Sequence, residues 1–379
     1  MATSSTTRTG TSRRRVKVKS ESISNLNGHA NGTFTVRASA PHAPSQKPRR
    51  WPLPFLLLLT SLSLYAINPT EDSILHHFIF LSYKEPNANP KLAIQYGKGL
   101  WDIAFVSFYT LVLFTAQEFI MHELLSPLAR FCGIKSLRKQ ARFMEQVYSV
   151  LYFGCTGVAG LYVMRQTPVW YFNTTGMYEA FPHRTHEAAF KFYYLFEAAY
   201  WAQQAVVMLL GLEARRKDFK ELVAHHIVTL ALIGLSYRFH FTYIGIAIYT
   251  THDISDFFLS LSKSFHYTGS DLVIPFYAVN VVAWIYLRHY QNLRVLYSLL
   301  TEFRTVGPYE LNWETQQYKC WISNIITFTL LAMLQALNLF WLYCLGRSAW
   351  KLLAYGEKKD DRSDDSGDEG AHANGNAKK

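Results

Sequence analysis

Apolar blocks recur along most of this 379-residue chain, and their length constrains the fold more than any other feature. A helix needs about 20 mostly apolar residues to cross the hydrocarbon core of a bilayer. Eight segments approach or exceed that length: residues 51–67, 100–125, 143–164, 188–212, 222–237, 241–261, 273–300 and 321–345. The sequence therefore predicts an all-α, polytopic membrane protein with about eight transmembrane helices.

Both ends of the chain are polar and contain few large apolar residues. Such segments cannot bury enough apolar surface to offset the entropy lost on ordering. We therefore predict a disordered basic tail over residues 1–50 and a disordered acidic tail over residues 356–379. The net charge of +11 arises largely in the basic tail. Because this tail directly precedes an apolar segment, a cytosolic location is favoured over binding to nucleic acid.

The charges of the loops agree with one orientation. An even number of spans places both termini on the same side, and the basic tail predicts that this side is the cytosol. Residues 130–142 and 213–221 each carry several Lys and Arg side chains, and both fall on the cytosolic side of this topology.

Short motifs suggest two kinds of modification. Asn173 begins an N-glycosylation sequon in an expected lumenal loop, although Asn31 begins the same pattern in the expected cytosolic tail. Ser363 and Ser366 lie among acidic residues. That pattern is typical either of a solvated charge run or of phosphorylation by an acid-directed kinase.

Ionisable residues inside the apolar segments are the strongest functional signal. Each costs about 2.5 to 3.5 kcal/mol at the centre of a membrane helix, so each calls for an explanation. The densest group comprises His225, His226, His252, Asp253, Asp256 and Lys263. At helical spacing the last four lean towards one side. If segments 222–237 and 241–261 pack side by side, the His pair approaches this stripe.

Several kinds of site fit such a group. The residues could satisfy one another as a buried polar cluster between helices. No metal site is predicted, because the HxxxH and HxxHH patterns of membrane di-iron enzymes and any CxxC spacing are absent. His183 and His186 form only a lone HxxH in an expected lumenal loop. Acid–base or nucleophilic catalysis remains: an imidazole could deprotonate an amine or accept an acyl group from a thioester.

The same segment resembles a family signature. Residues 225–267, HHIVTLALIGLSYRFHFTYIGIAIYTTHDISDFFLSLSKSFHY, are similar to the signature of the ceramide synthase (longevity-assurance) family of TLC-domain proteins. Residues 191–204 and 216–219 resemble that family too. The resemblance implies a TLC domain over residues 138–355, with six helices bundled around an intramembrane cavity. Residues 51–137 would form two further transmembrane helices and a lumenal loop.

The resemblance implies a ceramide synthase of the endoplasmic reticulum membrane. Such an enzyme transfers the acyl group of fatty acyl-CoA to the amine of a sphingoid base, sphinganine or phytosphingosine, and no further cofactor is implied. The catalytic positions of the family correspond to His225, His226, Asp253 and Asp256. His225 would take either the acyl chain or the amine proton.

Four other residues are candidates for substrate binding. His252 and Lys263 belong to the polar stripe. Glu197 and Trp201 are four residues apart, so they share a helix face and either line the cavity or pack between helices.

The homeobox-like domain of most animal members is absent, so the resemblance is to the fungal type. It makes a small single-span regulatory subunit, and a homo- or hetero-dimer, candidate partners. The alternative function is a TLC-domain protein that binds or transfers lipids without forming a bond. The complete set of His and Asp residues favours the enzyme.

Overall fold

The computed structural model describes residues 49–86, 93–213 and 216–355. Ser363, Ser366 and nearly all of both predicted tails lie outside the described residues. Each predicted apolar segment is helical. The helices over these segments are α1 (Pro52–Ile67), α3 (Trp101–Phe119) with η1 (Ile120–Leu125) and α4 (Ser126–Phe131), α5 (Leu137–Arg165), α6 (Ala188–Leu209), α7 (Phe219–Arg238), α8 (Thr242–Thr268), α9 (Val273–Trp284) with η3 (Ile285–Gln291) and α10 (Asn292–Thr301), and α11 (Trp321–Tyr355).

The predicted helical membrane protein is confirmed in its main features. Among the described residues, four helical stretches are long and apolar enough to cross a bilayer by length and composition. They are Trp101–Phe131, Leu137–Arg165, Phe219–Arg238 and Trp321–Tyr355. A tight turn connects α7 to α8, and in it His240 adopts a positive φ of 68°.

Several short elements lie outside the long helices. A short helix, α2 (Ile74–Ile79), and a 3₁₀ turn, η2 (Thr175–Met177), lie in the loops. Strands β1 (Gln95–Tyr96) and β2 (His186–Glu187) pair antiparallel. The all-α prediction is wrong at this ladder, because strands of two residues are too short to show an alternating pattern.

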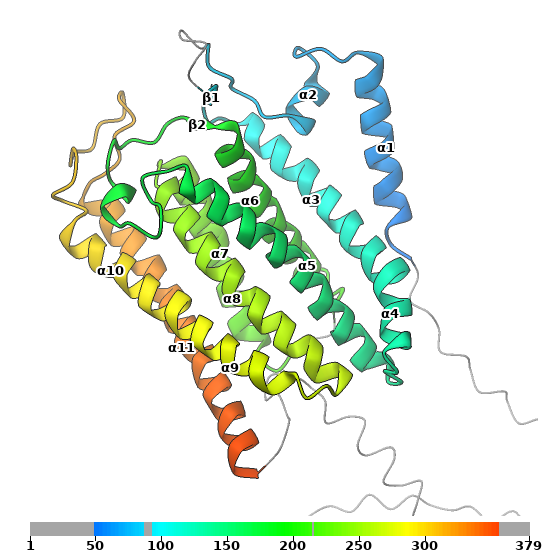
Figure 1. Cartoon of the computed structure of the whole chain (residues 1–379). Coiled ribbons are helices and arrows are strands. Elements are labelled where there is room, and N and C mark those ends of the chain that lie inside the picture. Colours follow the sequence, from blue (N-terminus) through cyan, green and yellow to red (C-terminus); the bar gives the residue numbers. More distant parts are fainter. Residues whose placement is uncertain (1–48, 87–92, 214–215, 356–379) are drawn as a thin grey trace, which may run out of the picture. The chain divides into compact units, whose positions relative to one another are not determined.

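Helix α8 lies at the centre of the arrangement (Figure 1). It packs along α5 on one side and against α9 on another, while α3 packs against α6 and α1 against α3. Small residues permit the close approach of α5 to α8. A Cβ atom added at Gly157 would lie 3.3 Å from Cγ1 of Ile254, and one added at Gly154 would lie 3.3 Å from Cε2 of Phe257.

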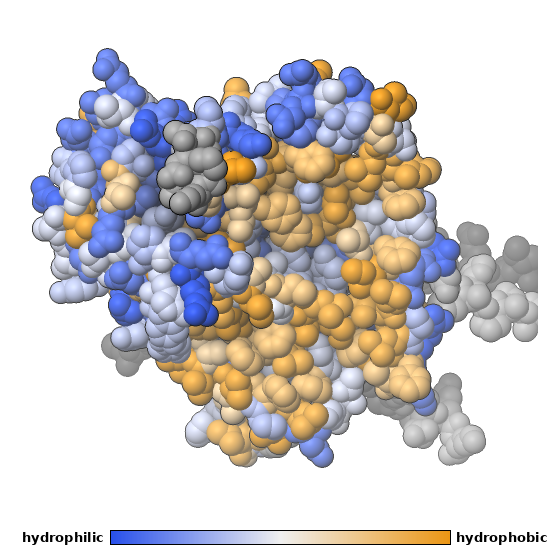
Figure 2. Space-filling view, turned by 45° about the horizontal axis from the view of Figure 1, so that its top comes forward, coloured by the Kyte–Doolittle hydropathy of each residue, from blue (hydrophilic) through white to orange (hydrophobic). Residues whose placement is uncertain are grey.

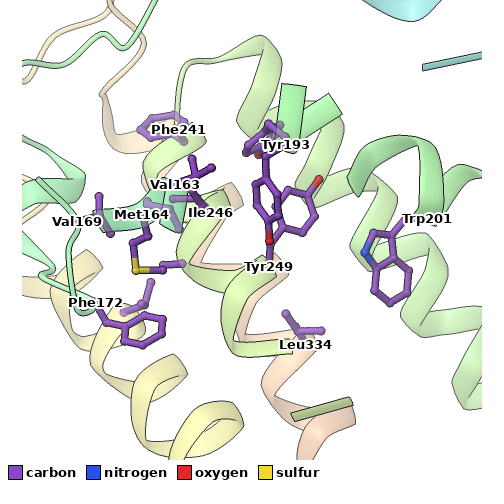
Figure 3. Close-up of a cluster of buried hydrophobic side chains, with 14 of the residues drawn as sticks. Val163, Met164, Val169, Phe172, Tyr193, Trp201, Phe241, Ile246, Tyr249 and Leu334 are labelled. Atoms are coloured by element: carbon purple, nitrogen blue, oxygen red, sulfur yellow. The ribbon is translucent and has the colours of Figure 1, made fainter. Parts of the chain in front are cut away.

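Buried aromatic and aliphatic side chains hold the helices together. The cluster in Figure 3 draws on α5, α6, α8, α11, the loop after α5 and the turn before α8. Its labelled members are Val163, Met164, Val169, Phe172, Tyr193, Trp201, Phe241, Ile246, Tyr249 and Leu334. Burial of one large apolar side chain contributes about 1.5 to 3 kcal/mol in water. In a bilayer the apolar environment removes much of that difference, so close packing contributes more of the stabilisation.

Apolar side chains also cover much of the outer surface. Leu53, Leu57 and Leu64 of α1 are 69%, 52% and 53% exposed. Figure 2 shows hydrophobic residues gathered in a broad patch over the visible face, with hydrophilic residues along its upper edge. An exposed apolar surface of this kind suits contact with lipid, as expected for a membrane protein.

A buried ion pair joins α3 to α6. The ammonium of Lys191 lies 2.7 Å from Oδ1 of Asp102, and the Lys191 side chain is fully buried. Lys191 also donates to the carbonyl oxygens of Ser82 and Gly97, at 2.9 and 2.7 Å. The Tyr237 hydroxyl of α7 donates to Oδ2 of Asp102 at 2.8 Å. One carboxylate therefore connects three helices near the β ladder.

Two buried histidines lie in the loops beside this ion pair. His183 Nε2 lies 2.8 Å from the carbonyl oxygen of Glu179, and Nζ of Lys98 lies 3.3 Å from His240 Nδ1. Burial lowers the pKa of His183 to about 4. Burial and the nearby Lys98 ammonium lower the pKa of His240 to about 3. Both imidazoles are therefore neutral in the folded protein at neutral pH.

We expect this region to make folding sensitive to mild acid. The unfolded chain binds protons near pH 6.5, whereas folded His183 resists protonation until about pH 4. The stabilisation is therefore fully present above pH 6.5 and is lost as the pH falls towards 4. The thermal unfolding midpoint in detergent should fall over this range, and His183→Gln should flatten the decline. His266→Gln serves as the control; equal slopes for all three proteins would contradict the prediction.

Candidate active site

An apolar cavity of about 210 Å³ lies among α6, α7, α8 and α11. Its polar lining includes His225 and His252. Most of the other lining residues are apolar or aromatic: Tyr194, Trp201, Leu232, Ile233, Leu235, Phe239, Phe241, Ile244, Ile248, Tyr249, Leu311, Trp313, Tyr318, Ile322, Ile326, Leu330, Leu331 and Leu334. The structure therefore brings two of the predicted histidines to one cavity suited to an apolar chain.

A second, polar cavity of about 410 Å³ lies at the end of α7 that carries its first residues. His226 lines it together with Arg142, Glu145, Glu213 and Arg216. Neighbouring residues on a helix point about 100° apart. The consecutive histidines thus line different cavities, His225 the apolar one and His226 the polar one.

The polar cavity contains both signs of charge. Arg142 and Glu145 form an ion pair at 2.7 Å. Burial raises the pKa of Glu213, in the loop between α6 and α7, to about 7, and the nearby Glu145 carboxylate adds to this rise. The sequence identified the basic character of this region, but the acidic partners became apparent only from the fold.

His225 has few polar contacts. Within the described residues its Nδ1 has no hydrogen-bond partner, and its Nε2 lies 3.4 Å from Oγ1 of Thr229. Two indole rings instead meet the imidazole edge to face. The ring centroids of Trp201 and Trp341 lie 5.4 and 5.3 Å from that of His225. Nδ1 of His225 is therefore an unsatisfied ring nitrogen on a side chain that lines the apolar cavity.

His226 and His252 are fixed differently. Nδ1 of His226 lies 2.9 Å from the carbonyl oxygen of Leu222, and Nδ1 of His252 lies 2.8 Å from that of Ile248. A carbonyl oxygen only accepts, so each Nδ1 carries the proton and donates it. Nε2 of His226 then presents a lone pair, and Nε2 of His252 accepts a long contact from the Asn338 amide at 3.5 Å.

Asp256 pairs with an arginine that the sequence reasoning missed. Arg288 of η3 lies 2.6 Å from Oδ2 of Asp256 and donates to Oγ of Ser255 at 2.6 Å. Its guanidinium also donates to Oδ1 of Asn338 at 3.2 Å. A cation inside the apolar segment 273–300 was a signal that could have found it. Asn338 then links this ion pair to His252.

Asp253 and Glu197 lie elsewhere. Both are fully buried, and neither lines either cavity. The hydroxyl of Tyr193 donates to Asp253 at 3.1 Å, and that of Tyr152 donates to Glu197 at 3.1 Å. The expectation of one common side is therefore wrong for Asp253, which turns towards α6 while Asp256 meets η3.

The remaining candidates are spread along the chain. Trp201 lines the apolar cavity, which was one of the two roles expected for it; the other was packing between helices. Lys263 is half-buried near the end of α8, outside the lining of both cavities. Asn173 is exposed in the loop after α5, where its amide donates to the carbonyl oxygen of Pro168 at 3.1 Å.

The geometry suits chemistry between an apolar chain and a polar group. Of two adjacent imidazoles, one lines an apolar cavity and the other a charged one, and the first has a ring nitrogen without a hydrogen-bond partner in the described residues. Imidazole at this position can move a proton or accept an acyl group. Among the described residues, no group of three or more His, Cys, Asp or Glu side chains is arranged to hold a metal ion.

Comparison with known proteins identifies similar sequences. The model of the TLC domain matches residues 142–347. Sphingosine N-acyltransferase-like protein FUM17 of Gibberella moniliformis is 56% identical over 318 residues, which cover 83% of this chain and 82% of that protein.

Two yeast proteins are similar over comparable lengths. Sphingosine N-acyltransferase lac1 of Schizosaccharomyces pombe is 45% identical, with 88% of this chain and 85% of that protein covered. Ceramide synthase LAG1 of Saccharomyces cerevisiae is 46% identical, with 85% of this chain and 77% of that protein covered.

Proposed function

This chain belongs to the ceramide synthase family of TLC-domain proteins, and from that premise we propose that it acylates sphingoid bases with fatty acyl-CoA. The amine nitrogen attacks the thioester carbon, the carbon–sulfur bond breaks, and ceramide and free CoA are formed. One observation carries the assignment to a site. An imidazole with an available nitrogen, that of His225, lies at the wall of an apolar cavity, next to a second imidazole that faces a charged cavity.

The cavities suggest how the substrates are arranged. The apolar cavity suits the hydrocarbon chain, and the polar cavity suits the hydrophilic CoA end of the thioester. His225 takes the proton that the nitrogen loses, or accepts the acyl group in a first step. The proton that the amine nitrogen loses balances the one that the CoA thiolate gains, and the lone pair on Nε2 of His226, on the side of the polar cavity, can accept a proton in that transfer. Asp256 and Arg288 hold the helix that carries His252 against the cavity.

Asp253 and Glu197 have supporting roles in this proposal. Asp253 and Glu197 lie between α5, α6 and α8, where their hydrogen bonds orient the helices that line the apolar cavity. Lys263 lies further along α8, towards the end of the helix. A lipid-binding protein without chemistry would not require His225 and the Asp256 pair inside a membrane, where ionisable groups are unfavourable.

The membrane arrangement follows from the same premise. We propose eight transmembrane helices, with two in residues 51–137 and a six-helix TLC bundle in residues 138–355, in the endoplasmic reticulum membrane with both termini in the cytosol. Basic residues at 130–142 and 213–221 support this orientation. A single-span regulatory subunit, dimerisation, glycosylation at Asn173 and phosphorylation at Ser363 or Ser366 are compatible with it.

Acyl transfer by the purified full chain tests the function. With sphinganine and a panel of acyl-CoA lengths, we expect ceramide and free CoA in equal amounts, and a preferred chain length set by the apolar cavity. Mass spectrometry would identify the ceramide and a thiol reagent would quantify CoA. Absence of both products, even with membranes supplying candidate subunits, would favour the lipid-binding alternative.

A further inference from the structure

Two tryptophans, Trp201 and Trp341, pack against His225, and Trp341 is the more firmly anchored of the two. It comes from α11, is buried, and places its ring centroid 5.3 Å from the imidazole at an interplanar angle of 81°. Its Nε1 donates to Oδ2 of Asp218 at 3.1 Å. The indole therefore cannot rotate without losing a buried hydrogen bond to a carboxylate.

Asp218 is itself held in place. Its carboxylate accepts from Nε and Nη2 of Arg216, at 3.0 and 3.2 Å, in a two-pronged arrangement. The residue is 4% exposed and directly precedes the first residue of α7. Two contiguous contacts thus lead from the start of α7 across to α11 and back to His225 in the same helix.

His225 needs such support more than its neighbours do. The Nδ1 atoms of His226 and His252 are fixed by backbone carbonyl oxygens, whereas Nδ1 of His225 has no hydrogen-bond partner in the described part of the chain. Aromatic packing is therefore the main restraint on its ring. Proton or acyl transfer requires the reacting atoms to be aligned within a fraction of an ångström.

We propose that Asp218 is a positioning residue for acyl transfer: it fixes Trp341, and Trp341 fixes the His225 imidazole towards the apolar cavity. The inference rests on the proposed function only in naming the reaction that this arrangement serves. Arg216, which also lines the polar cavity, orients the carboxylate. Asp218 touches neither reacting group, so its effect on the reaction passes through the indole.

The test combines kinetics with a double-mutant cycle. Asp218→Ala and Trp341→Phe should each lower kcat by about 10- to 100-fold, because a small displacement of a catalytic group has an effect of that size. The acyl-CoA KM should change by less than about 3-fold, since binding contacts are kept. The double variant should be no slower than the slower single variant, because both changes break one chain of contacts.

Asp218→Asn is the matched variant. Its amide oxygen can still accept from the Trp341 indole, so it should recover most of the kcat that Asp218→Ala loses. A role confined to the start of α7 predicts the opposite pattern: Trp341→Phe would leave kcat unchanged, and the losses would be additive. Either of these results would overturn the proposal.

A chemical probe separates this inference from the proposed function. The rate at which diethyl pyrocarbonate modifies His225, followed by peptide mass spectrometry, should change by at least about 3-fold in Asp218→Ala and Trp341→Phe and return towards wild type in Asp218→Asn. This modification rate can be measured whether or not the protein forms ceramide. An unchanged rate would refute the positioning role, whereas a changed rate in a protein that makes no ceramide would refute the proposed function alone.

Discussion

Replacement of His225 with alanine is expected to lower kcat for ceramide formation by about 10²- to 10⁴-fold, the usual contribution of a general acid–base residue. The reason is positional as well as chemical. In the described structure this imidazole has an available ring nitrogen and lines the apolar cavity. The KM for acyl-CoA should change much less, since the proposed arrangement places the hydrophilic end of that substrate in the polar cavity. Initial rates with sphinganine and a long-chain acyl-CoA measure both constants.

Two comparisons make this prediction specific. His266→Ala, near the end of α8, is the same substitution outside both cavities and should retain wild-type kcat. Added imidazole should partly restore His225→Ala, because the truncated side chain leaves room beside the apolar cavity. His225→Ala with wild-type kcat in folded protein would remove this residue from the mechanism.

A single-turnover experiment with wild-type protein distinguishes the two roles left open for His225. If the imidazole accepts the acyl group, wild-type protein mixed with acyl-CoA alone should release one equivalent of CoA and gain the mass of the acyl chain on His225. If it only takes the proton, CoA should be released only after sphinganine is added, and His225 should not gain the acyl mass at any stage. Intact-protein mass spectrometry after an acid quench reads out the difference.

The helices could be predicted because bilayer thickness requires a minimum length of apolar sequence. The segment predicted over residues 188–212 is observed as α6, Ala188–Leu209, and that over residues 222–237 falls within α7, Phe219–Arg238. Some ends differ because helices extend into the polar region, and the difference is largest at α11, which was predicted to end at residue 345 and ends at Tyr355. The β ladder was missed because pairing of two residues depends on loop positions that no periodic pattern indicates.

The sequence predicted which residues form the candidate site, but it predicted only some of the directions in which their side chains point. Spacing placed His252 and Asp256 on one face of α8, and Asn338 and Arg288 do connect them. The same reasoning failed for Asp253, because one residue of separation turns a side chain by about 100°. Arg288 could not be paired from sequence spacing, because spacing relates residues of one helix and its partner Asp256 lies in another.

The second large effect concerns the stability of the pair formed by Asp256 and Arg288. Arg288→Met should lower the free energy of unfolding by about 3 to 5 kcal/mol, the range for removal of one partner from a buried ion pair. Arg288 and Asp256 are 3% and 18% exposed at their side chains, so water screens little of the charge that remains. The substitution also removes the donors to Ser255 and Asn338. Unfolding in mixed micelles of dodecylmaltoside and sodium dodecyl sulfate measures the change.

A matched substitution lies on the same helical run. Arg294 of α10 is half-buried and donates to Gln291 at 3.2 Å, and Arg294→Met should change stability by about 1 kcal/mol or less. The double variant Arg288→Met with Asp256→Asn should recover part of the lost stability, because it no longer places a carboxylate charge in a poorly solvated position. Equal losses at Arg288 and Arg294, or a double variant no more stable than Arg288→Met, would show that the ion pair is not what holds α8 against η3.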